Sequence, residues 1–83
     1  LSTYRDNVSV IDYLDSKQTK IDGHLVAPIV ICTEGLRGYH YPEYGDGSLR
    51  TIYMTKSEVD TFNENFTRQD HKAIRRFAIL NDL

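Results

Sequence analysis

The pattern of hydrophobic and polar positions favours a strand over residues 49–54. Successive side chains of a strand point to opposite faces of a sheet. Leu49, Thr51 and Tyr53 would then face one way, and Arg50, Ile52 and Met54 the other. The alternation therefore predicts a β-strand over residues 49–54.

The longest apolar run, residues 25–32, predicts a second strand over residues 25–33. It is rich in β-branched residues and apolar on both alternating faces, which is typical of a strand buried on both sides. Pro28 has no N–H to give to a sheet, so we expect it at an edge position or a bulge. The preceding pair Asp22 and Gly23 favours a two-residue hairpin turn, because both turn positions need positive φ. We therefore expect a hairpin that leads into this strand.

The remaining N-terminal and central segments have weaker patterns. Residues 8–14 fit a strand or one turn of helix, and their β-branched positions favour the strand. Residues 15–18 read as a polar turn, and residues 34–38, with two glycines, as a connection. Residues 39–44 are compatible with another strand, and the glycines of 45–48 predict a turn after it.

At Thr55 the apolar period changes from two residues to about 3.6. Thr55 and Glu58 have the spacing of a capping box, in which each side chain accepts a backbone N–H across the first helical turn. Three apolar residues then share one helical face: Val59, Phe62 and Phe66. The sequence therefore predicts a helix over residues 56–65.

A weaker cap at residues 67–70 predicts a second helix over residues 68–79, with Ile74 and Phe77 opposite a basic face. Together these elements predict the α+β class: a small antiparallel sheet of three or four strands, followed by two short C-terminal helices packed on one face. The chain has 83 residues, so we expect residues 1–83 to form a single small α+β domain.

Composition and charge narrow the possible functions. Hydrophobic residues make up 40% of the chain and charged residues 27%, which is an ordinary globular balance. The net charge of −2 does not favour nucleic acid or an anionic membrane surface. A membrane span needs about 20 apolar residues, far more than any run here, so we expect no membrane partner. The single cysteine, Cys32, favours a reducing compartment or a place within an assembly.

No pattern in the sequence predicts catalysis. Cys32 lies in an apolar run, where a buried thiol is inert. The motifs of serine hydrolases, zinc proteases and nucleotide-binding proteins do not occur. His40, Glu43 and Asp46 come nearest to a metal-ligand cluster, but they are more simply solvated turn residues. We therefore predict no enzymatic activity, no cofactor and no metal.

The most unusual local feature is a tyrosine-rich segment with charged neighbours. Five of its residues are candidate partner-binding positions: Arg37, Tyr39, Tyr41, Glu43 and Tyr44. Tyrosine supplies a large contact area at low entropic cost and is enriched at protein interfaces. In an extended segment, Tyr39 and Tyr41 would share one face that contacts a partner. The same pattern fits a half-buried strand whose tyrosines cover this domain's own core, and both interpretations stay open.

The basic face of the last predicted helix is a second candidate surface. Four residues fall within about 100° of arc: Arg68, Lys72, Arg75 and Arg76. Such a face would bind nucleic-acid phosphates, although a solvated amphipathic helix is the commoner origin of this pattern. Ile79 would fall on the same side. That position predicts either that the helix ends near Phe77 or that Ile79 meets a partner.

These observations predict a non-enzymatic protein–protein interaction module. We expect an accessory or structural subunit of a larger assembly, with a virion component or an inhibitor as particular forms of this class. Its partner would be another protein or a second copy of itself. The alternative is a small nucleic-acid-binding regulator that uses the basic face of the C-terminal helix.

Overall fold

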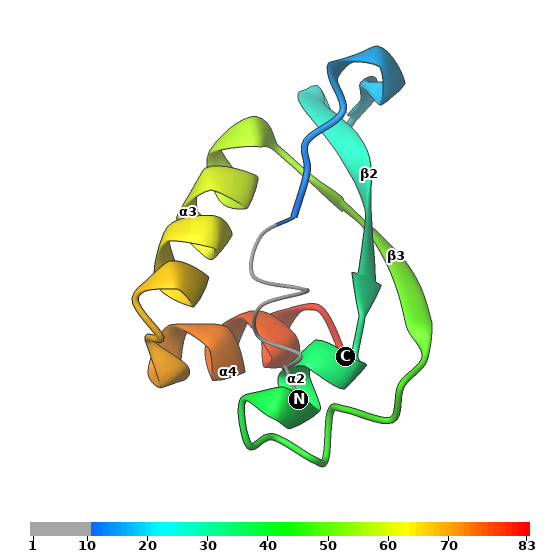
Figure 1. Cartoon of the computed structure of the whole chain (residues 1–83). Coiled ribbons are helices and arrows are strands. Elements are labelled where there is room, and N and C mark those ends of the chain that lie inside the picture. Colours follow the sequence, from blue (N-terminus) through cyan, green and yellow to red (C-terminus); the bar gives the residue numbers. More distant parts are fainter. Residues whose placement is uncertain (1–10) are drawn as a thin grey trace.

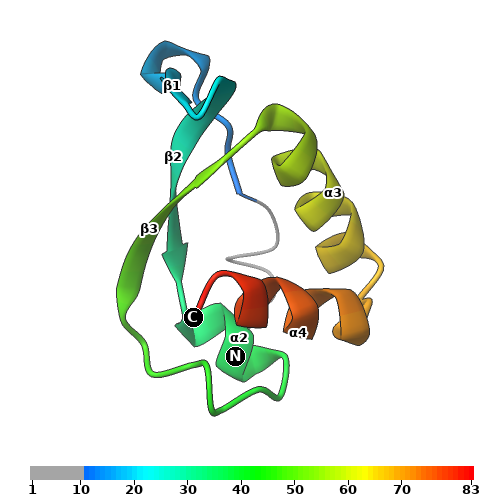
Figure 2. The same cartoon turned by 180° about the vertical axis from the view of Figure 1, so that it is seen from behind.

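A computed structural model describes residues 11–83 of the chain (Figure 1). The elements in chain order are η1 (Asp15–Lys17), β1 (Thr19–Ile21), β2 (His24–Cys32), α2 (Glu34–Gly38), β3 (Leu49–Met54), α3 (Lys56–Thr67) and α4 (His71–Leu80). The strands form one antiparallel sheet in the order β1-β2-β3. Helices α3 and α4 lie together on one side of this sheet, as Figure 2 shows from behind. The predicted α+β class is confirmed.

The hairpin between β1 and β2 forms where Asp22 and Gly23 predicted it. Asp22 has φ 51° and Gly23 has φ 81°, the left-handed pair that a tight hairpin turn requires. The flanking residues Ile21 and His24 are paired across the two strands. β1 pairs with β2 only as far as Val26, so the rest of β2 has β3 as its only partner strand among residues 11–83.

β2 confirms one expectation about the apolar run and overturns another. Pro28 pairs with Tyr53 in the stretch where β2 has no strand on its other side, so its edge position is confirmed. Burial of both faces is wrong, because Ile29 and Ile31 are buried while Val30 between them is 60% exposed. The helices cover only one face of the sheet, so Val30 on the other face stays exposed, whereas Val26 on that face is buried.

β3 covers the predicted residues, and its two alternating sets differ in burial. Met54 is buried in the core and Ile52 is half-buried against it, whereas Leu49 and Tyr53 are largely exposed. The alternation in the sequence therefore marks a core face and an open face. Arg50 lies on the core face, because it pairs with the buried Ile31. Its guanidinium donates to the carbonyl of Asp82 near the C-terminus.

α3 begins with the predicted capping box: Thr55 accepts from the Glu58 N–H, and the Glu58 carboxylate accepts from the Thr55 N–H. α4 begins three residues later than predicted, at His71, because Asp70 provides the cap by accepting from Ala73 N–H at 3.1 Å. Gln69 between the helices has φ 57°, a left-handed conformation that no helix can contain.

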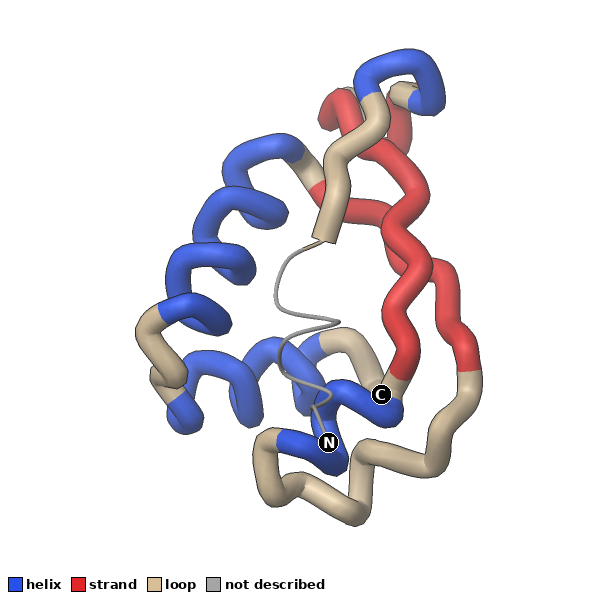
Figure 3. Tube along the Cα trace, in the orientation of Figure 1, coloured by secondary structure: helices blue, strands red, loops and turns tan. Residues whose placement is uncertain are grey.

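One predicted strand does not form, and the described part of another is loop. Residues 8–10 lie outside the described residues, and residues 11–14 are loop (Figure 3). There the Asn63 side chain replaces a strand partner, accepting from Ile11 N–H at 2.8 Å and donating to Ile11 C=O at 2.9 Å. Residues 39–44 are a turn that follows α2, and the predicted connection at residues 34–38 is α2 itself.

The core lies between the sheet and the two long helices. Its buried members are Ile29, Ile31, Leu36, Tyr39, Tyr41, Met54, Val59, Phe62, Phe66, Ile74 and Ala78. The three predicted apolar positions of α3 all belong to it. Among residues 11–83, no helix has the length and apolar character needed to cross a membrane.

Candidate functional site

The tyrosine segment is folded into the core rather than extended. His40 has φ 71°, which breaks the alternation of an extended chain. As a result Tyr39 and Tyr41 both turn inward, and they are only 2% and 6% exposed. The predicted extended face is therefore wrong, and the alternative in which these tyrosines cover the domain's own core describes both residues.

Each buried tyrosine also uses its hydroxyl to join the turn to the helices. Tyr39 Oη–H donates to the carbonyl of Phe66, near the C-terminus of α3, at 2.8 Å. Tyr41 Oη–H donates to the carbonyl of His71, the first residue of α4, at 2.6 Å. Buried tyrosine hydroxyls need such partners, and a backbone carbonyl has a second lone pair with which it can accept. Burial raises the pKa of Tyr41, with the nearby Arg75 acting in the opposite direction.

Arg75 joins the two sets of candidate residues that the sequence kept apart. Its guanidinium forms an ion pair with Glu43 at 3.0 Å. The same group lies 4.9 Å from the ring centre of Tyr41 and 5.9 Å from that of Tyr44. A predicted nucleic-acid contact and three predicted partner contacts thus bind one another within the chain. They hold the tyrosine turn against α4.

Arg37 anchors the loop that leads to β3. Its Nε–H donates to the carbonyl of Gly45 at 2.7 Å, and its guanidinium pairs with Glu34 at 3.3 Å. A Cβ at Gly45 would lie 2.5 Å from the Cβ of Arg37, so the close approach requires glycine. No contact of the described residues tests whether Arg37, Glu43 or Tyr44 meets a partner, and that part of the hypothesis stays a prediction.

Asp46 organises the other end of this loop. Its carboxylate accepts from the backbone N–H of Ser48 at 2.9 Å, from the Ser48 hydroxyl at 2.7 Å and from the Thr33 hydroxyl at 2.8 Å. These hydrogen bonds, the backbone one first, hold the pKa of Asp46 well below its usual range. Asp46 is thus a structural group of the loop. No group of three or more His, Cys, Asp or Glu side chains within residues 11–83 has the arrangement of a metal site.

The predicted basic face is divided between two elements. Arg68 lies at the end of α3, where it pairs with Glu64 at 3.5 Å, and Arg75 pairs with Glu43. Lys72 and Arg76 are exposed on α4 without an ion-pair partner in the described part of the chain. The nucleic-acid hypothesis stays a prediction that now depends on these two residues.

The C-terminal end of α4 settles one of the two expectations for Ile79. The helix continues past Phe77 to Leu80, so an early end is wrong. Ile79 is 57% exposed and Leu80 is 77% exposed. Contact between this exposed end and a partner stays a prediction.

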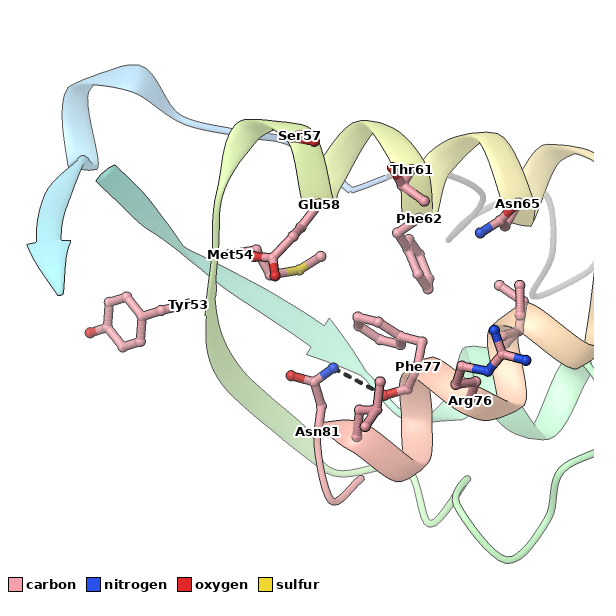
Figure 4. Close-up of a pocket in the computed structure, with 13 residues that line it drawn as sticks. Tyr53, Met54, Ser57, Glu58, Thr61, Phe62, Asn65, Arg76, Phe77 and Asn81 are labelled. Carbon is pink, nitrogen blue, oxygen red and sulfur yellow. Dashed lines mark hydrogen bonds between the residues drawn. The ribbon is translucent and has the colours of Figure 1, made fainter. Parts of the chain in front are cut away.

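A groove of about 490 Å³ runs between α3, α4 and the end of β3 (Figure 4). Phe62 and Phe77 point toward each other on its floor, with ring centres 4.5 Å apart. Glu58 and Arg76 stand at opposite parts of its rim. Every buried side-chain nitrogen and oxygen of the described residues has a hydrogen-bond partner, so no polar group in the groove calls for a ligand.

A second groove, of about 370 Å³, lies where residues 11–14 run past the free side of β2. Ile11 and Leu14 line it from one side and Val30 and Cys32 from the other. It adjoins the N-terminal boundary of the described residues. We therefore place no site there.

Within residues 11–83, nothing covers the sheet face away from the helices, and this face is largely apolar. Its members from β2 and β3 are Pro28, Val30, Cys32, Leu49, Thr51 and Tyr53. Val30, Leu49 and Tyr53 are 60%, 72% and 52% exposed. Figure 4 shows the Tyr53 ring on the opposite side of β3 from Met54, although Tyr53 also belongs to the residues at the edge of the groove. Sequence reasoning missed this site, although the alternation of residues 49–54 already marked it.

The outer edge of β3 carries unpaired backbone groups. Thr33 N–H donates to Ser48 C=O at 3.0 Å across the end of the β2–β3 ladder. Hydrogen-bonded and non-bonded pairs alternate in antiparallel strands, so Leu49, Thr51 and Tyr53 direct their N–H and C=O groups away from β2. Pro28 opposite Tyr53 fits this parity, since proline has no N–H. Within the described part of the chain, these backbone groups have no hydrogen-bond partner.

The two edges of the sheet are protected to different degrees. β1 exposes only three residues, and Lys20 is the central one. The free edge of β3 is six residues long and contains no proline or glycine. Its single charged residue, Arg50, donates to the carbonyl of Asp82 at 2.8 Å. Natural edge strands are commonly short, charged or interrupted by proline. By these criteria the β1 edge is protected against pairing with another strand, and the β3 edge is not.

No family model, no curated protein and no solved structure matches this chain. The fold and the site therefore define the class that can be stated: a small α+β domain with an open apolar sheet face and a free strand edge.

Proposed function

We propose that this chain is a non-enzymatic protein–protein interaction module, an accessory or structural subunit of a larger assembly, that contacts its partner through β3. The observation that carries the proposal is the row of unpaired backbone groups at Leu49, Thr51 and Tyr53, beside exposed apolar side chains.

The chemistry of an open strand edge favours a protein partner. An extended segment that adds to the edge satisfies the outward N–H and C=O groups, and its side chains pack on those of β3. Burial of the apolar surface of Leu49 and Tyr53 would contribute about 25 cal/mol for each Å² removed from water. An open apolar edge without a partner promotes aggregation. A partner that covers the edge explains why β3 lacks the proline or the additional charges that protect other edge strands.

A photo-crosslinking amino acid tests this proposal in the protein's native mixture. The probe is placed at Leu49, on the open face, and in a separate variant at Lys72, which is equally exposed but lies on α4. We expect a discrete protein adduct from position 49, and none of that mass from position 72. The adduct should weaken when Thr51 is replaced by proline, because this change removes one outward N–H without touching the β2–β3 ladder.

Equal adducts from both positions, or none from position 49, would contradict the proposal. Circular dichroism and thermal unfolding of each variant show whether the fold is kept.

A further inference from the structure

We propose that the partner at the edge of β3 is a second copy of this chain, paired antiparallel across a two-fold axis with Thr51 opposite Thr51. This inference rests on the proposed function and names its partner. It follows from two properties of the strand: the direction of its backbone groups and the pairing of its side chains.

The backbone sets the allowed registers. Leu49, Thr51 and Tyr53 point their N–H and C=O groups outward, so these residues must form the hydrogen-bonded pairs of any antiparallel addition. With Thr51 opposite Thr51, Leu49 of each copy lies opposite Tyr53 of the other. All the outward groups of both strands then find partners. A register shifted by two residues leaves the end of each strand unpaired.

The side chains of β3 favour the same register. On the open face, Leu49 packs beside Tyr53 of the second copy, an aromatic–aliphatic cross-strand pair, and does so twice by symmetry. On the core face, Arg50 lies opposite Ile52. The neighbouring register would place Arg50 directly opposite itself, and like charges in that position are destabilising. The strand is thus complementary to its own reverse.

The charges that flank β3 already have partners within the chain. Asp46, before the strand, accepts hydrogen bonds from Ser48 and Thr33, and Lys56, at the start of α3, forms an ion pair with Asp60 at 2.7 Å. The register of the pair is therefore set by the backbone groups and the side chains of β3 itself.

A cysteine scan tests the register, on a background in which Cys32 is replaced by serine. We expect Thr51→Cys to form an interchain disulfide under mild oxidation, since a hydrogen-bonded pair places its Cα atoms about 5.5 Å apart. Leu49→Cys is the matched control on the same face. Its two copies would lie about 13 Å apart along the strand, beyond disulfide reach.

Variants of opposite charge, studied alone and mixed, test whether the partner is a second copy of the chain. Leu49→Lys with Tyr53→Lys and, separately, Leu49→Glu with Tyr53→Glu place like charges opposite each other, so each variant alone should give the monomer mass of 9.6 kDa by light scattering. An equimolar mixture should give twice that mass, because lysine then faces glutamate. The unchanged chain should shift from the monomer mass to twice that mass as concentration rises.

Three results would overturn the inference: a monomer mass at every concentration, a disulfide at position 49 but not at 51, or a mixture that stays monomeric. None of them bears on the photo-crosslinking experiment. If position 49 then yields an adduct with a different protein, the interaction role stands and only the second copy fails.

Discussion

The turn of residues 39–44 and the strand β3 are both rich in aromatic and aliphatic side chains, but the fold uses them in opposite ways. Tyr39 and Tyr41 are buried, and their hydroxyls are bonded to helix carbonyls. Leu49 and Tyr53 lie on a face that nothing in the described chain covers. Aromatic density therefore does not separate an interface from a core in this protein. What separates them is whether the fold provides partners for the side chains and the backbone.

The largest expected contrast comes from truncating one side chain in each region. Tyr39→Ala should lower the free energy of unfolding by about 3–5 kcal/mol, because it leaves a cavity in the core and removes the hydrogen bond to the Phe66 carbonyl. Leu49→Ala should change it by less than about 0.5 kcal/mol, as is usual for an exposed position. Urea unfolding of both variants measures the difference. Equal losses would show that the two regions do not differ in this way.

A smaller contrast comes from removing single hydroxyl groups. Tyr41→Phe should cost about 1 kcal/mol, since it removes the hydrogen bond to the His71 carbonyl at the start of α4. Tyr53→Phe should leave the free energy of unfolding unchanged, because the Tyr53 hydroxyl makes no hydrogen bond within residues 11–83. Thermal unfolding of the two matched variants checks this. A loss at Tyr53 as large as that at Tyr41 would contradict the account.

The loop between the two regions provides a pH-dependent test. The hydrogen bonds from Ser48 and Thr33 lower the pKa of Asp46 in the folded state, so they favour the ionised, folded form. Their stabilising effect is fully present above the ordinary aspartate pKa of about 3.9 and is lost as the pH falls through the lowered value. Asp46→Asn should therefore be less stable than the unchanged chain at pH 7.

That difference between Asp46→Asn and the unchanged chain should shrink as the solution is acidified below pH 4. Urea unfolding at a series of pH values measures it. A constant difference at all pH values would show that the charge of Asp46 does not stabilise the loop.

The elements predicted correctly from the sequence depend on residues that are close together in the chain. The pair Asp22–Gly23 specifies its own turn, and Thr55 and Glu58, three residues apart, cap the start of α3. The alternation of residues 49–54 is complete within the strand. Each signal needs only the local backbone. Tertiary contacts then reinforced these preferences and did not override them.

The elements predicted incorrectly depend on distant residues or on unusual backbone angles. The burial of Tyr39 and Tyr41 requires Phe66 and His71, which lie 27 and 30 residues further along the chain. The left-handed φ of His40 prevents the predicted strand over residues 39–44, and that of Gln69 places the start of α4 later than predicted. Neither residue type predicts such a φ from the sequence.

The site on β3 shows the same division between local and distant information. The alternation of residues 49–54 was visible in the sequence. Its role as an edge strand was not, because that depends on the strand order β1-β2-β3. The direction of its free backbone groups follows only from the register with β2, which Pro28 and Thr33 define.

Hydrogen exchange of the β3 amides, resolved by residue and repeated over a range of protein concentrations, tests the central claim most directly. At the lowest concentration, we expect slow exchange at Arg50 and Ile52, which bond to β2, and fast exchange at Leu49, Thr51 and Tyr53. Raising the concentration should slow these three amides and leave the other two unchanged. Slow exchange at Thr51 in the dilute monomer would contradict the account, as would fast exchange there at every concentration.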